Sequence, residues 1–270
     1  MSVYYKEKPE YLRESIDSML SQTLKTDDFI IVCDGPLTDE LDKVLLEYEK
    51  KYPDIIHIKR LLKNGGLPGA LNAGLPLCKN ELVARMDSDD ISLPERCEKQ
   101  VKRFEENPNL AMLSTSLTEF VTDSNGKRIL QKEKSVPTSY NEILAYSKKR
   151  NPFNHPTMMY NKEKVLELGG YRQWPYFEDY DLWTRMLASG CEGENLKESL
   201  LYMRTEAGMY DRRGGLSYAK KAIAFRWDLF RRGYSKPGDF IISAGGQLVI
   251  SLLPSNARKK AYARMLRKRS

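Results

Sequence analysis

Apolar runs and amphipathic stretches alternate through the first hundred residues. Phe29–Cys33, Ile55–Leu62 and Leu82–Met86 are of strand length and rich in apolar residues, which is typical of parallel strands buried on both faces. Residues 10–23 carry apolar side chains at helical spacing, and Thr38 can cap a helix leading to the next strand. This alternation predicts an α/β fold with a Rossmann-like, mostly parallel sheet, right-handed crossovers and flanking helices.

The second half of the chain departs from this alternation. Leu110–Leu117 is predicted as a strand, the segment around Asn125-Gly126 as a hairpin, and Ser199–Arg204 as a further strand. A helix is predicted from the acidic EDYD segment to a stop at Gly190.

Polar residues follow three successive predicted strands at their carboxyl ends. Asp34 follows the first, Asn64-Gly65-Gly66 the second and the aspartates of residues 87–90 the third. Ligands of open α/β sheets bind at the carboxyl ends of the strands. We therefore expect these three groups to line one rim of the sheet.

Three carboxylates are concentrated in the third group. Asp87, Asp89 and Asp90 lie between a buried strand and a predicted helix, and Ser92 and Glu95 have capping-box spacing, so the helix is expected to begin there. Carboxylates crowded together repel one another unless a cation is bound, and oxygen-only ligands favour Mg²⁺ or Mn²⁺. The alternative is a solvated acidic turn that caps the helix, and the motif alone does not decide between the two.

Length and composition bound the remaining possibilities. The 270 residues are enough for a full core. The longest apolar segment, Phe240–Leu253, is interrupted by two glycines and is shorter than the ~18 residues of a spanning helix. Met1 is not followed by an apolar signal segment, and the four cysteines form no CxxC pair. We therefore expect a cytoplasmic protein with reduced thiols.

Charge is spread unevenly. Residues 212–270 carry fifteen Lys or Arg against two acids, a net +13, so residues 1–211 carry −6 of the overall +7. The stretch RKKAYARMLRKR near the end has seven basic residues and no acid. This asymmetry implies an anionic partner, such as a membrane surface, nucleic acid or an acidic substrate. A solvated basic helix is the alternative.

Several short motifs occur in an order that resembles a known enzyme family. They are SVY before an amphipathic helix, VCDGP after a strand, NGGLPGALNAG, ARMDSDDIS, NHPTMMY, GGYR and EDYDLWTRM. Over residues 1–215 the chain resembles the family 2 glycosyltransferases, inverting enzymes with the A-type nucleotide-binding fold, in particular those of bacterial capsule, exopolysaccharide and O-antigen assembly. Members usually carry several more apolar residues ahead of SVY, so the first strand is expected to be short here.

The resemblance implies transfer of a sugar from a nucleoside diphosphate donor, with UDP favoured, to a hydroxyl of an oligosaccharide or lipid-linked acceptor, with Mg²⁺ or Mn²⁺ as cofactor. It also implies roles for matching residues. On the donor side, Tyr4 and Asp34 would lie beside the base and ribose, and Asn64 and Gly65 beside the diphosphate. Asp87 and Ser88 would lie at the ribose or a metal-bound water, and Asp89 would bind the metal together with Asp87. Asp179, of the pair Glu178-Asp179, would be the general base.

We expect residues 1–211 to form the catalytic domain, with a donor-binding half at 1–106 and an acceptor half at 107–211, followed by a basic helical region at 212–270. Arg212, which lies beside glycines, can close over a diphosphate as a lid, although ordinary surface charge is the alternative. Trp183 is predicted as a core residue, and His155 as a structural residue or as a contact of the acceptor or the diphosphate. Residues 240–253 and the basic tail suit peripheral contact with the inner face of the plasma membrane.

Two other function classes fit parts of the chain. A sugar nucleotidyltransferase would share the fold type and the acidic site, but such enzymes carry a Gly-rich loop after the first strand, and SVYYKEKPEY has no glycine. A non-enzymatic nucleic-acid-binding protein would explain the basic end, but that region has no recognised binding motif. We therefore expect no nucleic-acid partner.

Overall fold

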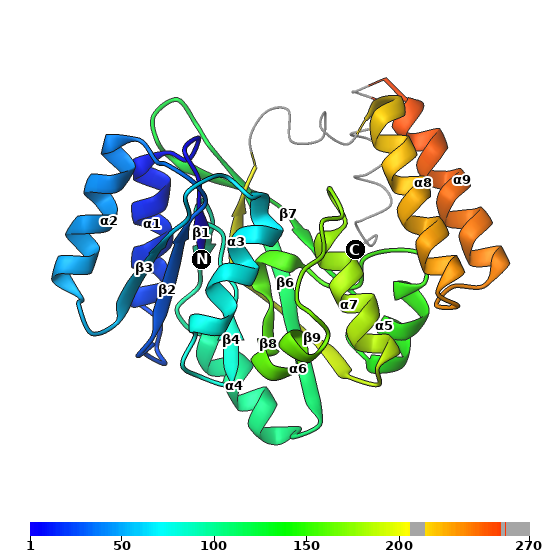
Figure 1. Cartoon of the computed structure of the whole chain (residues 1–270), viewed down its shortest axis with the longest axis horizontal. Coiled ribbons are helices and arrows are strands. Elements are labelled where there is room, and N and C mark those ends of the chain that lie inside the picture. Colours follow the sequence, from blue (N-terminus) through cyan, green and yellow to red (C-terminus); the bar gives the residue numbers. More distant parts are fainter. Residues whose placement is uncertain (206–213, 255–256, 258–270) are drawn as a thin grey trace.

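A parallel three-stranded layer forms the first part of the molecule. The computed structural model describes residues 1–205, 214–254 and 257 (Figure 1). Strands β1 (Ser2–Val3), β2 (Phe29–Cys33) and β3 (Ile56–Arg60) pair in the order β1-β2-β3, all parallel. The helices of this layer are α1 (Pro9–Leu20), α2 (Asp39–Lys51) and α3 (Gly66–Gly74).

Both faces of β2 are buried, as its continuous apolar run predicts. Phe29, Ile31 and Cys33 pack in the cluster that includes the apolar faces of α1 and α2. Ile30 and Val32 point the other way and pack with Ala70 of α3. Alternate residues of a strand point to opposite faces, so one apolar run anchors a helical layer on each side of the sheet.

The second sheet is mixed. Its strands are β4 (Leu82–Ala84), β5 (Ile91–Ser92), β6 (Leu110–Thr122), β7 (Arg128–Lys134), β8 (Met159–Asn161) and β9 (Glu192–Arg204). They pair in the order β4-β8-β6-β9-β5, with β7 on β6. Strands β6 and β9 are parallel and the other pairs antiparallel. The expected α/β fold is confirmed, with the uniformly parallel pairing confined to β1–β3.

The helices of this half are α4 (Arg96–Glu106), α5 (Tyr140–Ser147), α6 (Lys162–Glu167) and α7 (Glu178–Ala188), with 3₁₀ turns at Leu75–Leu77 and His155–Thr157. Trp183 of α7 is fully buried in the cluster that these elements enclose. The prediction that it is a core residue is therefore confirmed.

The predicted start of the fourth helix is wrong. Helix α4 begins at Arg96, and Ser92 lies in β5, where it pairs with Leu201 of β9. The Ser92 amide donates to Ser18 Oγ (3.0 Å), and its hydroxyl accepts from the side chain of Gln22 (3.1 Å). Pairing with a strand more than a hundred residues away thus outweighs the local capping signal.

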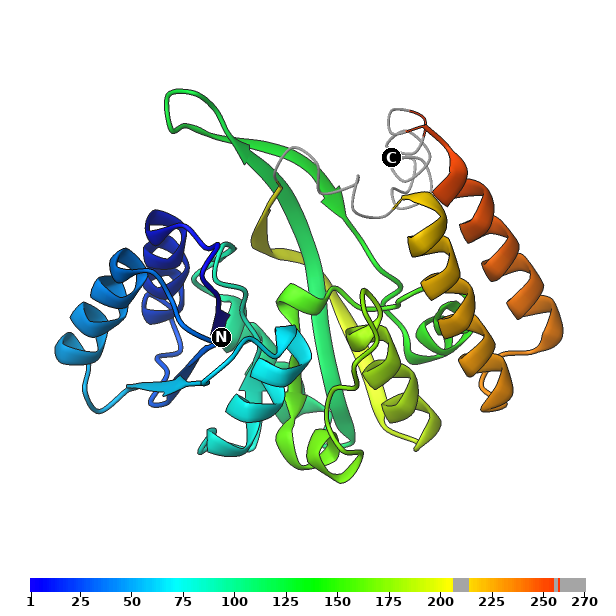
Figure 2. The same cartoon turned by 45° about the horizontal axis from the view of Figure 1, so that its top comes forward.

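Two long helices, α8 (Gly215–Arg231) and α9 (Pro237–Leu252), pack together at the end of the molecule opposite α1 and α2 (Figures 1 and 2). Helix α8 also packs against the start of α7, where the Phe177 and Phe225 rings stack with centroids 4.9 Å apart. An ion pair of 3.2 Å joins Arg232, just after α8, to the buried Asp181 of α7.

Strand β1 covers only part of β2. Ser2 pairs with Val32 and Val3 with Cys33, and the Met1 ammonium donates to the Ile30 carbonyl (2.9 Å). Burial lowers the pKa of this amino group to about 6. Beyond it lies a cavity of about 310 Å³ lined by parts of β2, β4 and α3, where a longer first strand would continue.

Candidate active site

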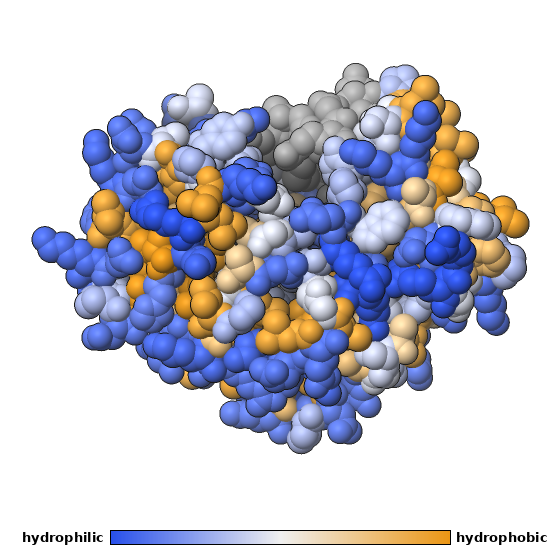
Figure 3. All heavy atoms as spheres, viewed as in Figure 1, coloured by the Kyte–Doolittle hydropathy of each residue, from blue (hydrophilic) through white to orange (hydrophobic). Residues whose placement is uncertain are grey.

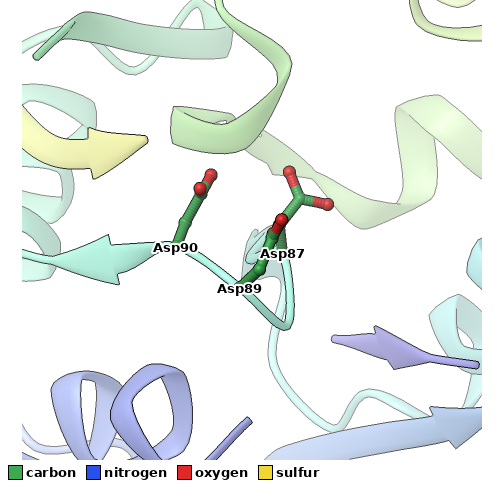
Figure 4. A group of neighbouring side chains, drawn as sticks. All are labelled: Asp87, Asp89 and Asp90. Carbon is green, nitrogen blue, oxygen red and sulfur yellow. The ribbon is translucent and has the colours of Figure 1, made fainter. Parts of the chain in front are cut away.

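The three aspartates of the DSDD segment form one acidic cluster. One carboxylate oxygen from each of Asp87, Asp89 and Asp90 lies within 4.8 Å of the others (Figure 4). Their loop is held beside the first layer by a parallel bridge between Ser2 and Asp87, and by Ser15 Oγ, which donates to the Asp87 carbonyl (2.6 Å).

Burial and mutual repulsion make the cluster unfavourable as free carboxylates. Burial, followed by the charges of Asp87 and Glu7, raises the pKa of Asp89 to about 7. Burial and the two neighbouring aspartates raise the pKa of Asp90 well above its usual value. Asp90 Oδ1 accepts from the Arg204 amide (2.9 Å), whereas its buried Oδ2 has no hydrogen-bond partner in the described part of the chain.

These observations fit a hard divalent cation. The donor atoms are all oxygen, they converge, and the raised pKa values mean that a positive charge placed among them is strongly stabilised. The unsatisfied Asp90 oxygen supplies a further potential ligand. A solvated acidic turn would not hold a carboxylate this deeply buried, so the structure favours the cation-binding interpretation.

The site contains a buried arginine that sequence reasoning missed. Both terminal nitrogens of Arg85 donate to the Asp87 carboxylate, and the side chain is almost fully buried. Its charge partly offsets the effect of burial, which raises the pKa values of Asp89, Glu178 and Asp179. The signal was present in the sequence: residues i and i+2 of an extended segment share a face, so Arg85 and Asp87 could be expected to pair.

Glu178 and Asp179 form a second acidic pair at the start of α7. Asp179 Oδ2 accepts from the Asn151 side chain (2.6 Å), and burial raises its pKa. Burial and the adjacent Asp179 raise the pKa of Glu178 to about 7. Asp181 instead pairs with Arg185 (2.8 Å), as expected because Asp179 and Asp181 lie on different faces of the helix.

The Asp34 rim lies next to the DSDD loop. Asp34 Oδ1 accepts from the Gly65 amide (2.7 Å), and the Asp34 carbonyl accepts from the Asn64 side chain (3.1 Å). Strand β1 contacts both regions, because the Asp34 amide donates to the Val3 carbonyl (2.8 Å) and Ser2 bridges to Asp87. These groups therefore adjoin across β1, as predicted, but the expected single parallel sheet is wrong here, because β4, which precedes the DSDD loop, belongs to the second sheet.

The remaining residues of the predicted donor site are Tyr4, Ser88 and Arg212. Tyr4 is 40% exposed, directly after β1, and Ser88 Oγ donates to Glu7 (2.6 Å). The Gln173 side chain donates to the Gly65 carbonyl (3.3 Å), so the segment before α7 reaches the Asp34 rim. Arg212 lies outside the described residues.

His155 lies in an aromatic cluster. Its Nε2 is 3.2 Å from the Tyr171 hydroxyl, and its ring packs against Trp183. Burial, and secondarily the Arg85 charge, lower its pKa well below the usual value. A neutral, packed histidine fits the structural role better than acceptor contact.

Comparison with known proteins identifies relatives over nearly the whole chain. Residues 2–169 match the sequence model described as Glycosyl transferase family 2. The chain is 37% identical over 268 residues to the Escherichia coli UDP-Gal:alpha-D-GlcNAc-diphosphoundecaprenol beta-1,3-galactosyltransferase, covering 99% of this chain and 95% of that one. It is 40% identical to the Erwinia amylovora amylovoran biosynthesis glycosyltransferase AmsE over 223 residues, or 83% and 81% of the two chains.

A solved structure shares the fold. The Pyrobaculum calidifontis mannosyltransferase PcManGT, in complex with GDP-Man and Mn²⁺, superposes with a TM-score of 0.63 at 16% identity, covering 98% of this chain and 75% of that one. Across the described ranges, no helix is both long enough and apolar enough to cross a membrane.

Proposed function

Because the chain belongs to glycosyl transferase family 2 and is a glycosyltransferase, we propose that it transfers a sugar from a UDP-sugar to a lipid-linked or oligosaccharide acceptor of bacterial surface polysaccharide synthesis. The proposed reaction depends on Mg²⁺ or Mn²⁺ and inverts the configuration of the transferred sugar. The observation that carries the proposal is the cluster of converging carboxylates, Asp87, Asp89 and Asp90, with a buried oxygen of Asp90 left unsatisfied and the buried Arg85 paired with Asp87. The E. coli relative, named for a UDP-Gal donor and a diphosphoundecaprenol-linked acceptor, supports the proposed donor and the lipid-linked acceptor.

In this proposal the first acidic group binds the donor. Asp89 and Asp87 hold the metal, and the unsatisfied oxygen of Asp90 is available to it. When bound, the cation neutralises the charge that develops on the departing diphosphate. Ser88 is held by its hydrogen bond to Glu7, close to the position proposed for the ribose.

The Asp34 rim completes the donor site. Tyr4 and Asp34 border the base and ribose, and Asn64 and Gly65 border the diphosphate. The Gly65 amide already donates to Asp34, which fixes the loop before the nucleotide arrives. Gly35 has φ +85°, and a Cβ there would lie 2.7 Å from the Asn64 amide nitrogen, so this tight approach needs glycine.

The second acidic group activates the acceptor. A general base works best when its pKa lies near the working pH, and burial raises the pKa of Asp179 while Asn151 fixes its orientation. Asp179 is the proposed base, and Glu178 is the adjacent carboxyl of the pair. A single displacement needs only this one catalytic carboxylate, whereas a retaining double displacement would need a carboxylate nucleophile as well.

We further propose that the three segments expected from the sequence have separate functions. Residues 1–106 bind the donor, residues 107–211 the acceptor, and residues 212–270 hold the enzyme at the inner face of the plasma membrane. Arg212 is proposed to close over the diphosphate. Family membership sets aside the nucleotidyltransferase and nucleic-acid-binding alternatives, and no observation favours either.

The test separates the two acidic groups. Purified protein is assayed for UDP binding by thermal shift, with and without Mn²⁺, and for sugar transfer to an undecaprenol-diphosphate-GlcNAc acceptor analogue. Asp89→Asn is expected to abolish the Mn²⁺-dependent part of UDP binding. Asp179→Asn is expected to keep that binding and to lose at least about 10²-fold in transfer rate.

Asp54→Asn is the matched control, because Asp54 is an exposed residue of the loop after α2, away from both groups. It should retain binding and transfer. Transfer by the Asp179→Asn protein at close to the wild-type rate would show that the base has been assigned wrongly.

A further inference from the structure

The outer face of α9 is aliphatic. Five of its side chains are between 38% and 67% exposed, namely Ile241, Ile242, Leu248, Val249 and Leu252. At 3.6 residues per turn they fall within an arc of roughly 120°, together with Gly238 and Gly245. Residues 240–253 include no charged side chain, so no charge interrupts this face, which we call the α9 face.

The side of α9 that packs against the molecule has the opposite character. Its buried residues are the small Ala244 and Ser251, and Gln247 Nε2 donates to Ser251 Oγ (3.2 Å) on the same side. A surface helix normally buries its aliphatic stripe and exposes polar residues. Helix α9 has the reverse distribution, since its larger aliphatic side chains face outward.

The α9 face continues onto α8. Trp227 is 48% exposed, and its ring lies 5.6 Å from that of Phe240 at the start of α9. Figure 3 shows hydrophobic residues along the outer edge formed by these two helices. Contiguous apolar surface of this kind marks a site that another apolar phase or surface covers.

The charges around the α9 face identify what covers it. Residues 214–254 carry six Lys or Arg and two acids, and both acids are paired: Asp228 with Arg232 (2.8 Å) and Asp239 with Lys149 (3.1 Å). Lys220 and Arg231 are exposed on α8. The stretch RKKAYARMLRKR follows α9 in the sequence.

An aliphatic face bordered by cations is complementary to an anionic lipid surface, where the aliphatic groups enter the acyl boundary and the cations meet the headgroups. It is poorly complementary to a second copy of itself, because pairing two such faces would bring two cationic hairpins together. We propose that the α9 face docks on the surface of an anionic membrane, with α9 lying in the plane of the interface.

This docking would place the catalytic end of α7 at a fixed distance from the lipid. Helix α9 packs on α8, and α8 is joined to α7 by the Phe177–Phe225 stack and by the hydrogen bond from Arg226 to the Tyr180 hydroxyl (2.8 Å). Glu178 and Asp179 begin α7. The docking thus deepens the proposed function, on which it rests for the idea that the acceptor is lipid-linked.

The test uses the full chain and flotation with vesicles of phosphatidylglycerol and phosphatidylcholine (1:3) or of phosphatidylcholine alone. The double variant Ile241→Gln/Val249→Gln replaces two exposed β-branched side chains of the α9 face that lie about two turns apart, at 67% and 62% exposure. It is expected to lower the partition coefficient on the anionic vesicles at least about tenfold, because each aliphatic side chain withdrawn from the acyl boundary contributes up to about a factor of ten. Wild-type binding is expected to fall by a similar factor on neutral vesicles.

The control is Ile129→Gln/Leu130→Gln on β7, where the two side chains are also exposed, at 43% and 51%. It should float like the wild type. Both double variants should keep the wild-type thermal shift with UDP and Mn²⁺. Absence of a thermal shift in the wild type with UDP and Mn²⁺ would contradict the proposed donor site. Vesicle flotation would still test the docking proposal on its own.

Two results would overturn the docking proposal. One is equal flotation of the α9 variant and the wild type on anionic vesicles. The other is a dimer of the wild type in sedimentation velocity without lipid that the α9 variant abolishes, because the face would then be covered by a second copy.

Discussion

The acidic cluster should make the metal-free protein more stable in mild acid than at neutral pH. Asp89 has a folded-state pKa of about 7 against an ordinary 3.8, so between these values the folded protein binds a proton that the unfolded chain does not. Stability therefore rises as the pH falls from above 7 towards 4, and this contribution is lost as the pH rises through 7. Asp90 acts in the same direction.

The size of the effect follows from the shift. Each pH unit below the folded-state pKa adds about 1.4 kcal/mol to the free energy of unfolding, so lowering the pH from 7.5 to 5.5 should add about 2 kcal/mol through Asp89 alone. For a chain of this length that corresponds to a rise in Tm of roughly 4 °C. His155 acts in the opposite direction, since it is kept neutral in the fold.

Differential scanning fluorimetry without metal measures this, with Asp89→Asn as the comparison. His155 is present in both proteins, so its contribution cancels in the difference between their pH profiles. The variant should lose the part of the pH-dependent gain that comes from Asp89, about 2 kcal/mol between pH 7.5 and 5.5, and Mn²⁺ at pH 7.5 should raise the Tm of the wild type much more than that of the variant. Asp54→Asn should follow the wild type. Parallel pH profiles for wild type and Asp89→Asn would refute the reasoning.

Three further substitutions test other parts of the structure. Arg85→Met leaves a partly buried carboxylate without its partner and should lower the free energy of unfolding in urea by about 3 kcal/mol, whereas Arg103→Met, at a more exposed pair, should cost under about 1 kcal/mol. Gly35→Ala should lower the Tm and weaken the UDP-induced shift, because its φ of +85° and the close Asn64 amide both oppose a Cβ. Asp181→Asn weakens the buried ion pair to Arg185 within α7 and the pair that joins α7 to Arg232, just after α8, and should cost about 3 kcal/mol in the same urea titration; an unchanged midpoint would contradict the packing described for α7 and α8.

Local signals were sufficient for much of the fold. Thr38 accepts from the Leu41 amide (3.3 Å) and caps α2, and Asn161 accepts from the Lys164 amide (3.1 Å) and caps α6. Both bonds join residues three apart, so the sequence contains everything that determines them. The same holds for the hairpin turn at Gly126, where φ is +76°.

Long-range contacts explain what the sequence did not show. Strand β9 begins at Glu192, seven residues before its predicted start, because it pairs with β6 along most of its length. The sequence pattern marks Arg204 only as the end of a predicted strand. In the structure its Nε donates to the carbonyl of Asp89 (2.9 Å), 115 residues away in the sequence. Side chains that support a site from a distant strand carry no local pattern, so only the assembled structure identifies them.

The buried amino group of Met1 has a practical consequence for handling the protein. Whatever is joined to that nitrogen, whether natural residues or a purification handle, passes directly into the cavity between β2 and β4. An extended aliphatic segment would suit the apolar side chains that line this cavity, whereas a polyhistidine sequence would place polar imidazole rings against them. Affinity handles intended to leave the enzyme undisturbed therefore belong elsewhere, for instance in the exposed β6–β7 turn.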